Sequence, residues 1–147
     1  MKSWVLDASV AAKWYLAGEP LTKEAIGVLE SFGAGQLALH VPDLFWPELG
    51  NILWTAVRHG RIAATDARHA IASISSGSIQ TDPSRPLLEK AFAIAQAWQQ
   101  TVYDATYVAL AVEQKRNLLT ADERLANALR AHYPVQWLGA LSSADRV

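Results

Sequence analysis

Four acidic residues stand out against apolar surroundings: Asp7, Glu48, Asp104 and Asp122. Asp7 directly follows the apolar run 4–6, and Asp122 follows the run 118–120 with one residue between them. Clustered carboxylates repel one another and supply hard oxygen ligands, so they suit a divalent cation such as Mg²⁺ or Mn²⁺. A cation held in this way can lower the pKa of a bound water and neutralise charge on a phosphoryl oxygen. Phosphodiester hydrolysis requires both effects.

Glu48 is informative because the helix predicted around it is apolar on nearly every side. Glu48, Asn51 and Thr55 interrupt that helix at spacings of three and four residues, which align them on one narrow polar stripe. A charge on such a helix is costly to bury alone, so Glu48 is expected to face a cation or another partner. Ser9, Thr120 and Asn51 are the residues expected to support the acids, the first two by hydrogen bonds that fix their rotamers.

The order of the predicted elements indicates how these acids meet. Short apolar runs predict strands at residues 4–6, 37–41 and 118–120, and further short strands are predicted at 78–81 and 135–137. The segments between them have helical composition, including helices predicted at 8–16 and 105–115. This alternation predicts an α/β fold with a mostly parallel sheet and helices on both faces. Ligands bind beyond the carboxyl ends of such strands, and Asp7 and Asp122 are expected to project there.

Each acid also has a simpler interpretation. Asp7 and Asp122 are plausible N-caps of the helices that follow them. Asp104 fits a capping box with Thr101. Glu48 needs no explanation if its helix face is exposed. A cap accounts for one acid at a time, however, and not for three at strand or helix ends with a fourth interrupting an apolar helix.

Composition narrows the class of protein. The chain has 147 residues, of which 51% are hydrophobic and 18% charged, so we expect a single folded domain over residues 1–147. The absence of cysteine excludes thiolate nucleophiles, zinc ribbons and iron–sulfur sites. The formal net charge of −1 provides no general attraction for nucleic acid, so RNA contact requires local basic residues. Lys13 and Arg124 are the candidates. No apolar run is long enough to span a membrane, and a cytoplasmic location is expected.

Four segments, taken together and in order, resemble the PIN-domain nucleases, and among them the VapC-type toxins. The segments are VLDASV (5–10), PELGNIL (47–53), YDATYVALA (103–111) and LLTADERL (118–125). The resemblance implies a three-layer α/β/α fold with a central sheet of about five short strands. It also implies an endoribonuclease that depends on Mg²⁺ or Mn²⁺ and leaves a 5′-phosphate and a 3′-hydroxyl. The catalytic and metal-binding quartet would then be Asp7, Glu48, Asp104 and Asp122.

The resemblance further implies two protein partners. One is a second copy of the chain, giving a homodimer, and the other is a small antitoxin of the VapB type that silences the nuclease. Trp14, Tyr15 and Trp46 lie on early helices that the family uses to receive the antitoxin. Core filling is the alternative role for each of these aromatic residues.

Two other functions remain open from the sequence. A PIN-like fold can serve only as a protein-interaction module, which would bind a partner and cleave no RNA. A Mg²⁺-binding phosphoacceptor domain shares the alternating topology. It requires adjacent early acids and a lysine at a late strand end, and neither is visible.

Overall fold

The computed structural model describes residues 1–142 and is built around a five-stranded parallel sheet with strand order β3-β2-β1-β4-β5. The strands are β1 (Lys2–Leu6), β2 (Leu37–Pro42), β3 (Gln80–Asp82), β4 (Asn117–Thr120) and β5 (Val135–Trp137). All five predicted strands are present, each within two residues of its expected position. The prediction of an α/β fold with a parallel sheet is therefore confirmed.

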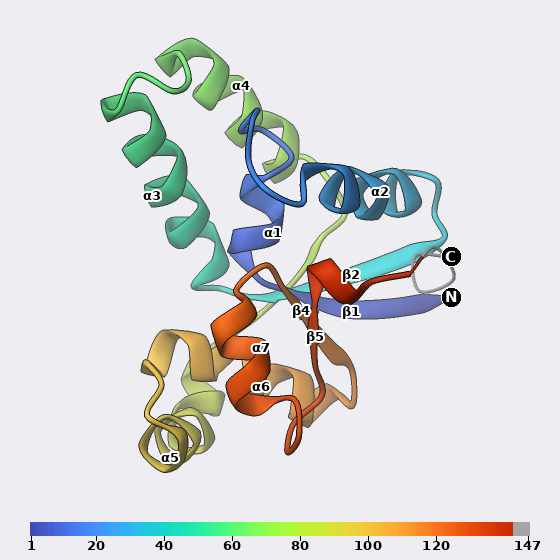
Figure 1. The fold of residues 1–147 in the computed structure, drawn as a ribbon, viewed down its shortest axis with the longest axis vertical. Helices are drawn as coiled ribbons and strands as arrows, with labels where there is room; N and C mark the ends of the chain where they lie inside the picture. Colours follow the sequence, from blue (N-terminus) through green and yellow to red (C-terminus); the bar gives the residue numbers. More distant parts are fainter. Residues whose placement is uncertain (143–147) are drawn as a thin grey trace.

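Helices cover both faces of the sheet, which gives the three-layer arrangement in Figure 1. One face carries α1 (Ala8–Ala12), α2 (Thr22–Gly33), α3 (Phe45–Arg58) and α4 (Ala64–Ser75). The other carries α5 (Leu88–Trp98), α6 (Val102–Gln114) and α7 (Glu123–Leu129). Two short 3₁₀ turns, Arg85–Leu87 and Leu138–Ala140, complete the described elements. In the described part of the chain, no helix is both long and apolar enough to cross a bilayer.

The strand order reverses direction between β1 and β4. From β1 the chain passes to β2 and β3 on one side, then crosses back through α5 and α6 to β4 on the other. The pairing of these two central strands continues past β1, because the backbone N–H of Asp7 donates to the carbonyl of Leu119 at 3.0 Å. Such a reversal opens a crevice at the carboxyl ends of the strands.

Helix α6 forms the centre of the core. Its residues from Ala105 to Ala111 are all buried, and the helix contacts β1, β2 and β4. A helix that is buried along this length is fixed firmly against the sheet, because its apolar side chains lose their contact with water only in that position. Its first turn therefore has a defined position beside the carboxyl ends of the central strands.

Two predicted helix boundaries are wrong. The helix expected at 8–16 ends at Ala12. After it, the backbone N–H groups of Trp14 and Tyr15 donate to carbonyls three residues back rather than four, which makes a tighter 3₁₀-type turn. The helix expected at 105–115 begins earlier, at Val102, because the Thr101 side chain caps it. The single domain expected over 1–147 includes residues 143–147, which lie outside the described part of the chain.

Candidate functional site

The four acids come from four different elements and meet at the carboxyl edge of the sheet. Asp7 follows β1, Glu48 lies on α3, Asp104 is in the first turn of α6, and Asp122 precedes α7. The effects of their charges on pKa values show that the side chains lie near one another. The charges of Glu48 and Asp104 both raise the pKa of Asp7, the charge of Asp104 raises that of Glu48, and the charge of Asp122 raises that of Asp104. The structure thus gathers all four residues singled out from the sequence into one acidic cluster.

Asp7 is the most deeply buried member of this cluster, with 6% of its surface exposed. Its Oδ2 accepts a hydrogen bond from the Thr120 hydroxyl at 2.8 Å, and its Oδ1 accepts one from the backbone N–H of Ser9 at 3.3 Å. Burial raises the pKa of Asp7 to about 7, and the charges of Glu48 and Asp104 act in the same direction. A carboxyl group with this pKa exchanges its proton readily for a cation near neutral pH.

Glu48 is half-buried, and its Oε2 accepts a hydrogen bond of 2.7 Å from the Tyr107 hydroxyl. Burial raises the pKa of Glu48, with a further contribution from the charge of Asp104. Tyr107 was not singled out from the sequence, because it lies within the apolar run that predicts a buried helix. The available signal was a single tyrosine hydroxyl among aliphatic residues, three positions after Asp104 and so on the same helix face.

Asp104 lies in the first turn of α6, next to the Thr101 cap, and Asp122 is the N-cap of α7, as the capping interpretation predicts. The Thr101 hydroxyl oxygen accepts from the backbone N–H of Asp104 at 3.0 Å, and Asp122 Oδ1 accepts from the N–H of Leu125 at 3.2 Å. Burial raises the pKa of Asp104, and the charge of Asp122 adds to this shift. Capping therefore explains where these residues occur, and the mutual charge effects show that they also face one another.

The donor chemistry of the cluster fits a hard divalent cation. Four carboxylates lie near one another there, and burial together with neighbouring carboxylate charges raises the pKa values of Asp7, Glu48 and Asp104, with no described basic residue among the causes. Within residues 1–142, no three Asp, Glu or His side chains already have the arrangement of a ligand set.

The supporting residues differ in what they do. Thr120 is wholly buried and contacts Asp7, and its hydroxyl oxygen also accepts from the N–H of Asp122 at 3.1 Å. Ser9 contacts Asp7 through its backbone, while its hydroxyl accepts from the N–H of Ala121 at 3.1 Å. The expectation that the Ser9 hydroxyl bonds an acid is thus corrected. Asn51 is exposed one turn beyond Glu48 and lines a small cavity rather than contacting the acids.

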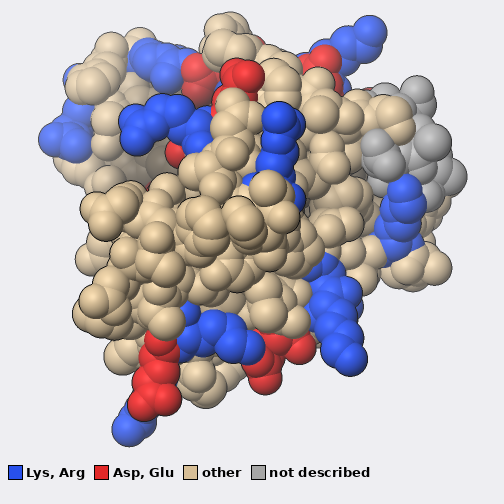
Figure 2. All heavy atoms as spheres, turned by 60° about the horizontal axis from the view of Figure 1, so that its bottom comes forward, with Lys and Arg blue, Asp and Glu red and all other residues tan. Residues whose placement is uncertain are grey.

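Basic side chains lie around the acidic site. Strands β1 and β2 run to the left in Figure 1, and Figure 2 shows acidic side chains in a recess at the upper left with Lys or Arg side chains beside them. Arg124 is exposed in the first turn of α7, two residues from Asp122. Lys13 is half-buried at the end of α1, the helix that Asp7 begins. Both residues therefore belong to the helices that Asp7 and Asp122 begin.

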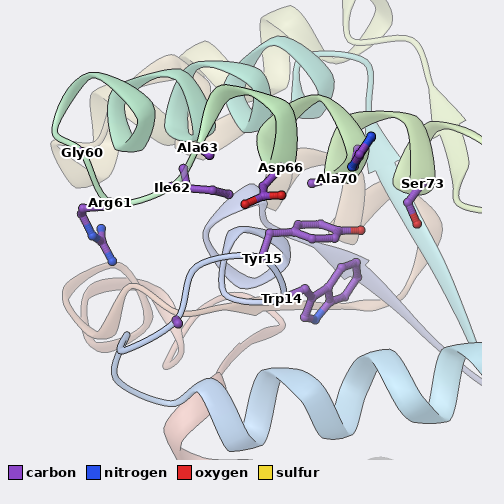
Figure 3. Close-up of a pocket in the computed structure, with 11 residues that line it drawn as sticks. Trp14, Tyr15, Gly60, Arg61, Ile62, Ala63, Asp66, Ala70 and Ser73 are labelled. Atoms are coloured by element: carbon purple, nitrogen blue, oxygen red, sulfur yellow. The ribbon is translucent and has the colours of Figure 1, made fainter.

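Trp14 and Tyr15 line a broad cavity of about 940 Å³ between the end of α1 and α4. Figure 3 shows Tyr15 between Trp14 and α4, with its hydroxyl end toward Ser73. Trp14 is mostly buried, and its indole N–H donates to the carbonyl of Ala25 at 2.8 Å, so it is also a core residue. Trp46 does not line this cavity, and its indole N–H donates to Thr81 Oγ1 at 3.0 Å.

Known proteins are similar to this chain in sequence and in fold. The model of the PIN domain family matches residues 4–130. Ribonuclease VapC3 of Pyrobaculum aerophilum is 32% identical over 129 residues, covering 86% of this chain and 95% of that protein. Among solved structures, a toxin–antitoxin complex from Klebsiella pneumoniae has a TM-score of 0.59 at 14% identity, covering 92% of this chain and 97% of that one. The sarcin-ricin loop cleaving toxin VapC20 of Mycobacterium tuberculosis has a TM-score of 0.62 at 16% identity, covering 85% and 94%.

Proposed function

The chain belongs to the PIN-domain family, among its VapC-type members, and from this we propose that it is an endoribonuclease toxin that requires Mg²⁺ or Mn²⁺. One observation carries the proposal: acids from four separate elements lie near one another at the carboxyl edge of the sheet, where burial and the charges of neighbouring carboxylates raise the pKa values of Asp7, Glu48 and Asp104. A fold without catalytic use for these charges gains nothing from placing them together, because each lowers the stability of the others' ionised form.

Asp7, Glu48, Asp104 and Asp122 would hold the cation. When bound, the cation would supply charge neutralisation at the scissile phosphate and activation of the attacking water. The chain's own contribution is to position its ligands. Thr120 holds the carboxylate of Asp7 and the backbone N–H of Asp122, and the Thr101 cap holds the backbone at Asp104. Because the backbone is fixed, each of these side chains has only a few rotamers to adopt when it binds the cation.

We propose that the substrate is RNA and that the protein acts in the cytoplasm. Lys13 and Arg124 would contact the phosphates of the RNA. The net charge of −1 makes local contacts necessary, and these two residues flank the acids on α1 and α7. VapC3 is named a ribonuclease and VapC20 a toxin that cleaves the sarcin-ricin loop, which supports the choice of RNA. The products would carry a 5′-phosphate and a 3′-hydroxyl.

A small antitoxin of the VapB type is the proposed protein partner. The cavity beside Trp14 and Tyr15 would receive one of its segments, because aromatic rings supply apolar contact area while Arg61 and Asp66 supply charges of both signs at the opening. The related fold of the Klebsiella toxin–antitoxin complex supports this proposal. Trp46, which lies elsewhere, would contact the antitoxin only if that segment continues toward β3.

A homodimer also remains a proposal. Leu88 and Phe92 are 56% and 59% exposed at successive turns of α5, so they form an apolar face on that helix. Figure 2 shows a broad area without charged side chains across the same side of the molecule. Exposed apolar patches of this kind commonly mark contact surfaces. Sedimentation equilibrium of the wild type and of Phe92→Glu would test whether α5 forms the interface.

Cleavage of a defined RNA by the purified protein tests the main proposal. Cleavage should require Mg²⁺ or Mn²⁺, stop when EDTA is added, and be lost in Asp7→Asn. Lys90→Gln, which removes an exposed ion pair between the first turn of α5 and Glu113 in the last turn of α6, is the control and should leave the rate unchanged. Tight antitoxin binding without cleavage of any RNA would instead favour an interaction module, and labelling by a phosphate donor would favour a phosphoacceptor domain.

A further inference from the structure

Tyr107 is the largest side chain in the described core with no exposed surface, and it carries a polar group into that core. It lies on α6, three residues after Asp104, so both side chains share one face of the helix. A buried tyrosine hydroxyl requires a hydrogen-bond partner. Here the partner is the Glu48 carboxylate on α3, with the Tyr107 oxygen 2.7 Å from Oε2.

This hydrogen bond connects three elements of the site. The hydroxyl donates to Glu48, and the backbone N–H of Ala8, next to Asp7, donates to the same hydroxyl. Among the described residues, Tyr107 makes the only hydrogen bond to the carboxylate of Glu48. Asp7, Asp104 and Asp122, by contrast, have their side chains or backbone held by local hydrogen bonds at the start of a helix.

We propose that Tyr107 is a positioning residue that holds the Glu48 carboxylate in the orientation needed to bind the cation. The proposal rests on the function proposed above. Glutamate has several rotatable bonds, so an unrestrained Glu48 would lose conformational entropy on joining a ligand set. The hydrogen bond from the Tyr107 hydroxyl restrains the Glu48 side chain before the cation binds. It uses only Oε2, which leaves Oε1 available to the acidic cluster.

A purely structural role for Tyr107 makes a different prediction. If the hydroxyl only satisfies its own hydrogen bond in the core, its removal lowers the free energy of unfolding and leaves cation affinity unchanged. If it positions Glu48, its removal weakens cation binding, and a sufficiently high cation concentration restores activity. Cation affinity measured on the folded protein therefore separates the two roles.

The test compares Tyr107→Phe with Tyr133→Phe by calorimetric titration with Mn²⁺. Both variants lose one hydroxyl that takes part in a side-chain hydrogen bond, but Tyr133 accepts its bond from Trp98 Nε1 at 3.2 Å, away from the acids. Removal of a group that orients a ligand costs about 10- to 100-fold in metal affinity. Tyr107→Phe should therefore bind Mn²⁺ at least about tenfold more weakly than the wild type, and Tyr133→Phe should bind it equally well. Equal affinity for all three proteins overturns the proposal.

A double-mutant cycle shows whether Tyr107 acts through Glu48. Tyr107→Phe should weaken Mn²⁺ binding when it is made in the wild-type protein. It should have little further effect when it is made in Glu48→Gln, because residue 48 then no longer carries the charge that Tyr107 positions. Additive losses would overturn the proposal. RNA cleavage by Tyr107→Phe should also recover as Mn²⁺ is raised, whereas a loss that persists at saturating Mn²⁺ contradicts a positioning role.

A measurement on the wild type does not depend on how the variants fold. The buried Tyr107 hydroxyl proton should give a slowly exchanging proton resonance, and that resonance should shift on titration with Mg²⁺. A resonance unaffected by saturating Mg²⁺ overturns the positioning role. Failure of the wild type to bind Mn²⁺ would overturn the metal-dependent function and this proposal together, whereas wild-type binding with no change in Tyr107→Phe overturns this proposal alone.

Discussion

The Thr120 hydroxyl lies 2.8 Å from Oδ2 of Asp7, although the two residues are 113 positions apart in sequence. The same hydroxyl oxygen accepts the backbone N–H of Asp122 at 3.1 Å. One wholly buried side chain on β4 therefore fixes both the rotamer of one acid and the backbone of another. The pairing of β1 with β4 brings these residues together, so the geometry of the site depends directly on strand order.

Thr120→Val should weaken catalysis more than it weakens the fold. Valine has nearly the same shape but no hydroxyl, so Asp7 loses a donor while the packing of β4 is kept. We expect RNA cleavage to fall by at least about tenfold. Thr120→Ser retains the hydroxyl and should keep most of the activity. Cleavage rates for both variants, with thermal unfolding in parallel, check this; equal rates for the two would contradict it.

The stability of the cation-free protein should decrease as pH rises from about 4 to about 7. Folding raises the pKa of Asp7 from its ordinary 3.8 to about 7, so the folded state binds more protons than the unfolded state in this interval. Stability then falls with increasing pH, by up to about 4 kcal/mol if Asp7 titrates alone. Urea unfolding at several pH values in EDTA measures the slope. Asp7→Asn, which keeps an oxygen acceptor for Thr120, should flatten it.

Asp104→Asn should abolish cleavage and leave the cation-free protein as stable as the wild type or more stable. The charges of Asp104 and its neighbours oppose ionisation in the cluster, so removing one of them relieves repulsion. The Thr101 cap uses the backbone N–H of residue 104, so it survives the substitution. A variant that unfolds would indicate that the carboxylate matters mainly to the helix.

Thermal unfolding with Mn²⁺ extends that prediction. A cation present at about 100 times its dissociation constant stabilises the folded state by about 2.7 kcal/mol, which corresponds to a rise of roughly 5–10 °C in Tm. The wild type should show this rise, and Asp104→Asn should show much less of it. Equal rises in the two proteins would mean that Mn²⁺ binds somewhere other than the acidic cluster.

The sequence predicts the sheet because alternating apolar runs and helical segments are local features, although β3 is a polar and largely exposed strand. It also singled out Asp7, Glu48, Asp104 and Asp122, since a carboxylate in apolar surroundings is visible without coordinates. The partner of Glu48 could not be predicted. Tyr107 is 59 residues away, and only the placement of α3 and α6 on opposite faces of the same sheet, meeting at its carboxyl edge, brings its hydroxyl to that carboxylate.

The roles of hydroxyl groups were also difficult to predict. Thr120 was correctly expected to bond an acid, but Ser9 does so through its backbone N–H. A hydroxyl close to a carboxylate in sequence has competing partners, and the tertiary arrangement decides among them. Ser9 reaches Ala121 only because α1 begins beside the end of β4. Similarly, Trp14 proved to be both a core residue and a wall of the cavity.

Tyr15→Ala should weaken antitoxin binding and leave RNA cleavage by the isolated protein unchanged. Tyr15 is half-buried in the wall of the cavity between α1 and α4, and its loss removes an aromatic surface of the kind that dominates binding energies. We expect a loss of affinity of at least about tenfold. Trp14→Ala is a poorer test, because Trp14 is only 9% exposed and bonds Ala25, so its loss would cost about 3–5 kcal/mol of stability. Calorimetric titration with an antitoxin of the VapB type, and cleavage of RNA in its absence, measure the two effects. A variant that binds the antitoxin as tightly as the wild type would remove this cavity as the docking site.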